Sequence, residues 1–163
     1  MSETIVAPVA RAQMLIRASA SRVFQAVVDP TVTSRFWFTR GSGRLEPGKT
    51  VRWEWEMYGV GTDVRVKEVE QDRRILVEWN GPENPTLVEW TLEPRSRERT
   101  LVTVKNWGFS GDPDKVVHEA LDATGGFNLV LAAMKAYLEH DIALNVVLDH
   151  DPDAIVAGWN ART

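Results

Sequence analysis

The residue types that could hold a metal ion gather near the end of the chain. They are His140, Asp141, Asp149, His150, Asp151 and Asp153. A calcium-binding loop would need a glycine and a more distant glutamate, and this segment has neither at the required spacing. A structural zinc site is built mainly from closely spaced Cys and His ligands, and the chain has no cysteine. The spacing therefore predicts an acidic surface segment, with no metal site and no cofactor.

Groups that could serve as a general acid or base are scarce at the positions predicted to face inward. Such a group must lie in a pocket and have a pKa suited to the reaction. Tyr58 and Asn106 could reach the mouth of a pocket, although turn or surface roles fit them better, and His118 fits a solvated helix face. The strand carboxylates alternate with apolar residues and are expected to point outward: Glu54, Glu56, Asp63, Glu78 and Glu89. No catalytic residue is predicted.

Seven tryptophans are an unusual number for a chain of 163 residues. An indole ring buries a large area and its N–H needs a partner, so these rings fill cores or line binding sites. Both interpretations stay open here, and we predict a cavity that binds a small hydrophobic or aromatic molecule. The predicted lining residues are Trp37, Trp53, Trp55, Val64, Val66, Trp79, Val88 and Trp90 on one side, and Phe127, Leu131 and Met134 on the other.

A long helix is predicted from Asp112 to His140. Asp112 suits the N-cap position and Pro113 suits the first helical position. Gly125 and Gly126 lie inside this helix, where each costs about 1 kcal/mol relative to alanine. We therefore predict a bend or a close backbone contact at this pair. Residues at spacings of three and four form a largely apolar stripe that must be covered: Val117, Leu121, Thr124, Phe127, Leu131, Met134 and Leu138.

The elements that cover this helix are predicted from alternating apolar and polar residues. A first strand is expected over Val9–Arg17, followed by a short helix capped by Ser19 or Ser21 and a second helical turn before residues 36–38. Five strands joined by short polar turns then run from residue 49 to residue 106, as in an antiparallel meander. The predicted fold class is α+β. A curved antiparallel sheet of six or more strands wraps around the long C-terminal helix, and two short helices follow the first strand.

Composition and charge exclude several partners. Hydrophobic residues make up 44% of the chain and charged residues 26%, as in an ordinary globular domain. The net charge of −4 disfavours nucleic acid or an anionic membrane surface as the main partner. Residues 1–11 lack the features of a signal peptide, and no apolar run approaches membrane-spanning length, so a cytoplasmic location is expected. The apolar tail over residues 141–163 is expected to pack on the body.

Several short motifs follow one another in an order that resembles a known superfamily. They are residues 18–26 before Asp29-Pro30, Phe36-Trp37-Phe38, Pro47-Gly48-Lys49, Val69-Glu70 before Arg73-Arg74, Glu78-Trp79 and Gly126-Phe127. This order resembles the helix-grip fold of the START-like (SRPBCC) superfamily. It is most similar to bacterial homologues of the C-terminal domain of the activator of the heat-shock-protein-ninety ATPase. The resemblance covers roughly residues 9–150, which implies a single START-like domain over residues 1–163.

The resemblance implies a fold and a cavity rather than one reaction. Members include lipid and hormone carriers, aromatases and cyclases of polyketide synthesis, and chaperone activators. Binding of a small hydrophobic molecule is the leading hypothesis. One alternative is an enzyme of the cyclase or aromatase type, which would need polar groups in the cavity. The other is a chaperone-interaction module, which would need an exposed binding surface, and the sequence does not indicate one. The family usually carries tryptophan where Phe127 stands, so an aromatic wedge is kept and an indole donor is lost.

Overall fold

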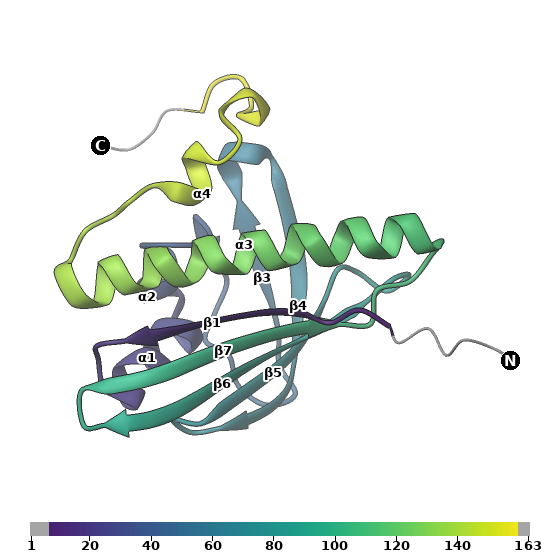
Figure 1. Cartoon of the computed structure of the whole chain (residues 1–163). Helices are drawn as coiled ribbons and strands as arrows, with labels where there is room; N and C mark the ends of the chain where they lie inside the picture. The colour runs from purple at the N-terminus through teal and green to yellow at the C-terminus, as the bar shows by residue number, and fades with distance from the viewer. Residues whose placement is uncertain (1–6, 160–163) are drawn as a thin grey trace, which may run out of the picture.

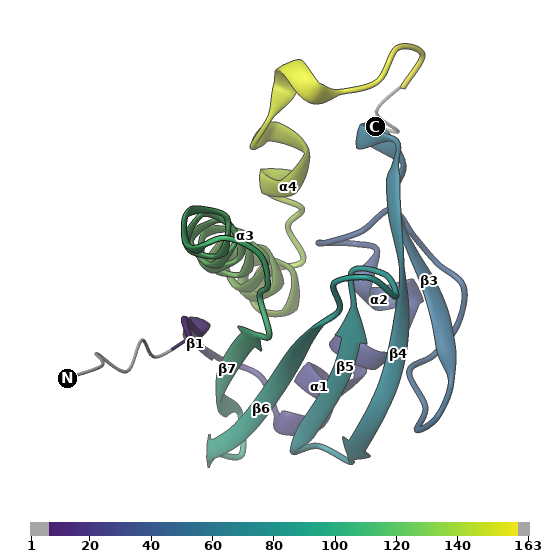
Figure 2. The same ribbon diagram turned by 90° about the vertical axis from the view of Figure 1, so that its right-hand side faces the viewer.

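The computed structural model describes residues 7–159 as a curled antiparallel sheet that grips one long helix (Figures 1 and 2). The helices are α1 (Ala20–Val28), α2 (Pro30–Thr33), α3 (Pro113–His140) and α4 (Val146–Asp149), with short 3-10 turns η1 (Glu56–Tyr58) and η2 (Pro152–Ala154). The strands are β1 (Ala10–Ile16), β2 (Arg40–Gly41), β3 (Thr50–Trp55), β4 (Val60–Glu70), β5 (Arg74–Trp79), β6 (Thr86–Ser96) and β7 (Arg99–Trp107). The predicted α+β helix-grip fold is confirmed.

The seven strands form one sheet in the order β1-β7-β6-β5-β4-β3-β2. Strands β3 to β7 are joined in sequence because short turns bring consecutive strands together as antiparallel neighbours. The first strand of the chain instead pairs with the last strand, from Ala10 opposite Asn106 to Ile16 opposite Thr100. This pairing places α1 and α2 at one end of the sheet, where they close the core (Figure 2).

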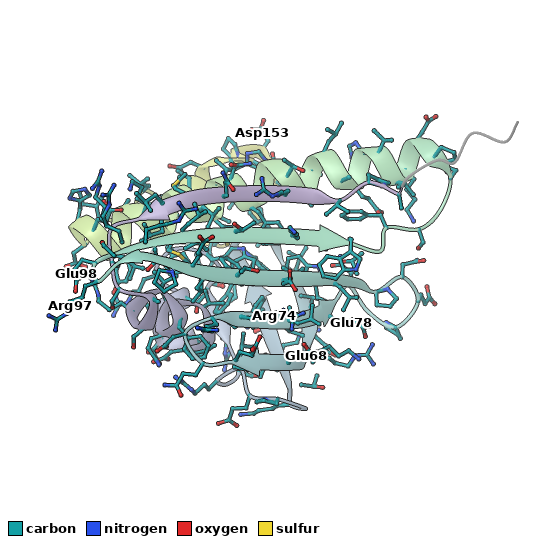
Figure 3. All side chains as sticks on the ribbon, turned by 60° about the horizontal axis from the view of Figure 1, so that its bottom comes forward. Glu68, Arg74, Glu78, Arg97, Glu98 and Asp153 are labelled. Carbon is teal, nitrogen blue, oxygen red and sulfur yellow. The ribbon has the colours of Figure 1, made fainter. Side chains whose placement is uncertain are left out.

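Alternation along the strands separates a buried face from a charged face. On the inner face Trp53, Val64 and Trp90 are almost completely buried. Val102 and Val104 are also buried, and they mark the inner face of β7. The outer face carries ion pairs between neighbouring strands, which Figure 3 shows around Glu68, Arg74 and Glu78. Exposed pairs of this kind contribute little to stability, so the inner face holds the sheet on the helix.

The helix α3 begins and ends where the sequence predicted. Asp112 accepts a hydrogen bond from the Lys115 backbone N–H at 3.0 Å, and Asp141 ends the helix in the left-handed conformation. Phe127, Leu131, Met134 and Leu138 are buried as predicted.

The predicted stripe is wrong in the first half of α3. Val117 is 52% exposed and Leu121 is 68% exposed. The reason is geometric: two successive steps of three residues, from Leu121 through Thr124 to Phe127, rotate the helix face by about 120°. The inward face of the first half is formed instead by residues such as Glu119 and Ala123.

The prediction of a close backbone contact at Gly125 and Gly126 is also wrong. A Cβ atom added to either glycine would meet nothing within 4 Å. Figure 1 shows α3 continuing through the pair without a sharp kink, so the predicted bend is absent as well. Both glycines are exposed, so no packing contact offsets their low helix propensity.

Replacing Gly125 with alanine is therefore expected to raise the free energy of unfolding by about 1 kcal/mol. Alanine has the higher helix propensity, and the added methyl group has open space around it. Urea unfolding followed by circular dichroism measures the change. A loss of stability in the Gly125→Ala variant would contradict the conformation described for this part of α3.

The C-terminal half of α3 is attached to β1 by a partly buried polar contact. The Lys135 ammonium donates to the Leu15 carbonyl at 2.9 Å and to the Glu139 carboxylate at 2.7 Å. The same carboxylate accepts from the Arg17 backbone N–H at 2.9 Å. The Glu139 side chain is only 7% exposed, so its carboxylate is largely shielded from water, whereas the Lys135 side chain is 35% exposed.

The segment after α3 turns back over the sheet (Figure 1). Asp141 and Asn145 both adopt left-handed backbone conformations before α4 begins. The Tyr58 hydroxyl shares its single proton between the carbonyl groups of Val147 and, at 3.0 Å, of Leu148. These contacts fix α4 above the end of β3 and opposite α3.

Candidate ligand-binding pocket

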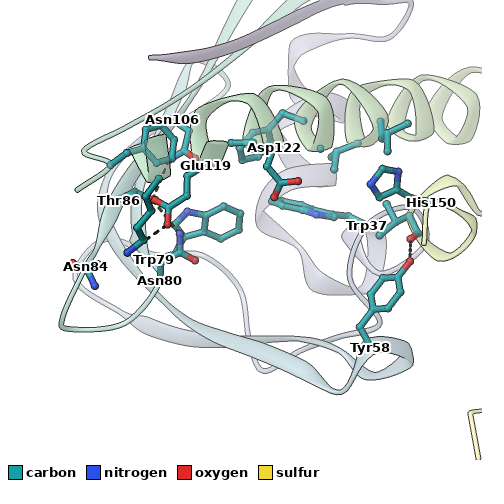
Figure 4. Close-up of a pocket in the computed structure, with 18 residues that line it drawn as sticks. Trp37, Tyr58, Trp79, Asn80, Asn84, Thr86, Asn106, Glu119, Asp122 and His150 are labelled. Carbon is teal, nitrogen blue, oxygen red and sulfur yellow. Dashed lines mark hydrogen bonds and ion pairs between the residues drawn. The ribbon is translucent and has the colours of Figure 1, made fainter. Parts of the chain in front are cut away.

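A pocket of about 550 Å³ opens between the first half of α3, the connection from β5 to β6, and α4 (Figure 4). One part of its wall is aromatic, one part carries amide and hydroxyl groups, and one part carries charged side chains of α3. The lining residues are Trp37, Tyr58, Trp79, Asn80, Asn84, Thr86, Asn106, Phe109, Lys115, Glu119, Asp122, Ala123, Gly126, Phe127, Leu129, Val130, Val147 and His150.

The aromatic part of the wall belongs to a larger cluster of rings. Trp79 and Phe127 stack with their ring centroids 5.8 Å apart, and Phe127 also meets the edge of Trp90 at 6.2 Å. Trp37 contacts both Trp79 and Phe127. Phe127 therefore forms the aromatic wedge that the sequence predicted. Because the rings pack against one another, they present a fixed surface to the pocket rather than movable side chains.

The structure brings three of the eleven predicted lining residues to the pocket: Trp37, Trp79 and Phe127. The other eight do not line it and lie in or against the core instead: Trp53, Trp55, Val64, Val66, Val88, Trp90, Leu131 and Met134. These eight residues therefore fill the core, which is the first of the two interpretations that the sequence left open. Phe38, for example, stacks on Trp53 with ring centroids 4.9 Å apart and fills the space that a ligand would need. The pocket lies at one end of the sheet rather than along its middle.

Asn106 is a pocket residue that sequence reasoning assigned to a turn or surface role. It is 1% exposed, and its Nδ2 donates to the Leu87 carbonyl at 2.8 Å and to the Thr86 hydroxyl at 3.1 Å. The signal that could have found it is the alternation in β7, since inward Val102 and Val104 are followed two residues later by Asn106.

Charged side chains reach the pocket from α3. Lys115 lies 3.8 Å from Glu119, and both are partly exposed. Asp122 extends toward Trp37 in Figure 4, and within residues 7–159 no ion pair involves its carboxylate. Sequence reasoning missed these side chains because it placed the inward face of α3 on Val117 and Leu121.

The remaining polar wall comes from Tyr58 and from the segment after α4. Burial raises the pKa of the Tyr58 phenol, and together with the negative charges of Asp151 and Asp149 it outweighs the hydrogen bond with the Asp151 backbone, which lowers the pKa. Tyr58 is therefore a neutral donor to the α4 carbonyl groups at physiological pH. His150 lies near it on the wall, whereas His118 is exposed as predicted. In the described part of the chain no group of three or more His, Cys, Asp or Glu residues could hold a metal ion.

A curled antiparallel sheet that grips a long helix beside a partly aromatic pocket defines a helix-grip protein of the START-like type. The chain belongs to the family described as Activator of Hsp90 ATPase homolog 1-like protein, whose family model matches residues 17–139. The family resemblance seen in the sequence motifs is thereby confirmed. Because the match ends at residue 139, α4 and His150 lie beyond it. No curated protein matches the chain.

Solved structures share the fold. A protein from Staphylococcus saprophyticus is 26% identical, with a TM-score of 0.71 and coverage of 84% of this chain and 96% of that one. The Aha1 dimer from Colwellia psychrerythraea is 20% identical, with a TM-score of 0.70 and coverage of 82% and 97%. DynU16, from the dynemicin biosynthetic locus, is 23% identical, with a TM-score of 0.68 and coverage of 83% of this chain and 48% of that one. The last two similarities show the fold alone. Within residues 7–159 no helix is long and apolar enough to cross a membrane.

Proposed function

We propose that this protein is a cytoplasmic, single-domain binding protein that holds a small aromatic molecule in the pocket beside α3. The observation that carries the proposal is the pocket of about 550 Å³ with Trp37, Trp79 and Phe127 in its wall. Ligand pockets typically have volumes of about 300–1,000 Å³ and present fixed aromatic surface with a few polar groups. A flat ring gains a large apolar contact on such a wall without requiring the protein to reorganise.

The two other hypotheses are less well supported. The pocket has polar groups, which a cyclase or aromatase would need, but the acid and base that pair among the described lining residues, Lys115 and Glu119, form a partly exposed ion pair on α3. Catalysis therefore stays an alternative hypothesis. A chaperone contact rests on family membership, and it too stays an alternative hypothesis.

Filling the pocket from α3 is expected to weaken ligand binding. Gly126 lines the pocket and has open space where a side chain would begin, so the Gly126→Leu variant should place its side chain in the cavity. We expect it to bind 2-naphthol at least about tenfold more weakly than the wild type, a loss of about 1.4 kcal/mol. Isothermal titration calorimetry measures both affinities.

The matched control is Gly125→Leu. Gly125 is the neighbouring helical glycine, has the same open surroundings and does not line the pocket. Both variants replace a helix-interior glycine with leucine, so their effects on helix stability are similar. We expect Gly125→Leu to bind 2-naphthol like the wild type. The proposal is wrong if naphthalene-sized aromatics do not bind the wild type, or if the two variants bind equally well.

A further inference from the structure

We infer that Asn106 selects the ligand of this pocket by accepting a hydrogen bond from it. The ligand class is then an aromatic molecule that carries an O–H or N–H donor and no negative charge. This inference rests on the proposed binding function and adds the chemical identity of the ligand to it.

The orientation of the Asn106 amide is fixed by its partners. The Leu87 carbonyl can only accept, so the atom 2.8 Å from it must be the NH2 end of the amide. The second contact, to the Thr86 hydroxyl at 3.1 Å, also uses Nδ2. Within residues 7–159 no donor is hydrogen-bonded to the Asn106 Oδ1 atom. The Asn106 side chain is only 1% exposed, and its Oδ1 atom is therefore free to accept a hydrogen bond from a ligand.

The acceptor is held in place before any ligand arrives. The Thr86 hydroxyl accepts from Asn106 and also from the Asn80 amide at 3.3 Å, so three side chains form one small network. Thr86 is 3% exposed, which limits the movement of the network. A preorganised acceptor binds a donor without an added cost of ordering, and a buried acceptor disfavours a ligand that cannot satisfy it.

The network lies next to the aromatic wall. Trp79 pairs with Thr86 across β5 and β6, and Val88 pairs with Asn106 across β6 and β7. Figure 4 shows Trp79, Asn80, Thr86 and Asn106 together at one end of the pocket. A ring that lies against Trp79 can therefore direct a polar substituent toward Asn106.

The charges on α3 disfavour an anionic ligand. Asp122 and Glu119 bring two carboxylates to the wall, and Lys115 is already close to Glu119. An aromatic carboxylate would bring a third negative charge beside Asp122, whose side chain is exposed, and like charges close together repel each other. A neutral or cationic donor avoids this repulsion.

The test uses three naphthalene probes with the wild-type protein and isothermal titration calorimetry. 2-Naphthol carries the donor, 2-methoxynaphthalene has the same ring without the donor, and 2-naphthoate carries a negative charge. We expect 2-naphthol to bind at least about tenfold more tightly than either of the others. Equal affinities for 2-naphthol and 2-methoxynaphthalene would overturn the role of Asn106 and leave aromatic binding intact. Failure of every probe to bind would overturn the proposed function and this inference together.

Two variants distinguish hydrogen bonding to Asn106 from a purely steric preference for one probe. The Asn106→Leu variant is expected to bind 2-naphthol and 2-methoxynaphthalene with nearly equal affinity. Asn128→Leu, the same change on an exposed part of α3, is expected to keep the wild-type preference. If the preference survives in Asn106→Leu, the inference is wrong. If that variant does not fold, the probe series on the wild type still decides the question.

The charge argument has its own pair of variants. Asp122→Asn is expected to bind 2-naphthoate at least about tenfold more tightly than the wild type does. Glu98→Gln, in the turn between β6 and β7 far from Asn80 and Thr86, removes the same charge without changing the pocket. It is expected to leave the 2-naphthoate affinity unchanged. Equal effects of the two variants would show that overall charge, and not Asp122, excludes the anion.

Discussion

Replacing Trp37 with alanine is expected to lower the free energy of unfolding by about 3–5 kcal/mol. Trp37 is 8% exposed and lies where the sheet, the loop before it and α3 meet. Its removal leaves a cavity that six neighbouring rings cannot fill without breaking their own contacts. Their centroids lie 5.0 to 6.0 Å from that of Trp37, and they belong to Phe38, Trp53, Trp55, Trp79, Trp90 and Phe127. A loss of this size is a large share of the about 5–15 kcal/mol that stabilises a typical domain.

Chemical denaturation followed by circular dichroism measures this loss. Trp107→Ala provides the matched control because Trp107 is half-buried at the end of β7 and lies outside the core cluster. We expect the control to lose less than about 2 kcal/mol, since less area is buried there and no central cavity forms. Similar losses in the two variants would show that the ring cluster around Trp37 has no special role in stability.

Replacing Glu139 with glutamine is expected to lower the free energy of unfolding by about 2 kcal/mol at pH 7. The Glu139 carboxylate accepts hydrogen bonds from the Arg17 backbone N–H and from Lys135. A neutral amide can accept the same two bonds but loses the charge assistance, which is worth about 1 kcal/mol for each. Thermal or urea unfolding of both proteins measures the difference.

The effect of Glu139 is expected to depend on pH. Burial alone would raise the pKa of the Glu139 carboxyl, but the hydrogen bonds from Arg17 and Lys135 and the charges of Lys135 and His140 outweigh it, so the pKa in the folded protein is lowered. The native state then binds fewer protons than the unfolded state. The stabilisation is present above the unfolded pKa of about 4.3 and is lost as the pH falls through the lower folded value.

Wild type and Glu139→Gln should therefore differ most near neutral pH and converge as the pH falls below about 4. The control is Glu98→Gln, which changes an exposed residue in the turn between β6 and β7 and is expected to have little effect at any pH. A difference between wild type and Glu139→Gln that stays constant from neutral to acidic pH would contradict the lowered pKa.

The elements of the fold could be predicted because their signals are local. Asp112 and Pro113 mark the start of α3 by capping chemistry, and alternation in β3 and β6 identifies Trp53 and Trp90 as inward residues. These signals depend only on neighbouring residues in the chain. They predicted the five-strand meander, the bounds of α3 and most of the buried face, whereas the pairing of β1 with β7 joins distant parts of the chain and follows from no local signal.

The wall of the pocket could not be predicted in the same way. Whether an inward residue lines a pocket or fills the core depends on the residue that packs opposite it. Trp53, for example, packs against Phe38, whereas Trp79 borders the open pocket. Asp122 was missed because the predicted stripe is rotated by about 120° in the first half of α3, which places the pocket-facing side chains on the outward side. His150 reaches the pocket only through the path of the chain after α3, which no local pattern describes.

The contact between Lys135, Glu139 and β1 also limits unwanted self-association. The outer edge of a β-sheet presents unpaired backbone groups that can recruit a strand from another molecule. Here one edge strand, β2, has only two residues, Arg40–Gly41. Near the other edge, the Leu15 carbonyl and the Arg17 N–H are occupied by side chains of α3. The same residues that attach the helix therefore reduce the backbone surface on which an aggregate could grow by strand addition.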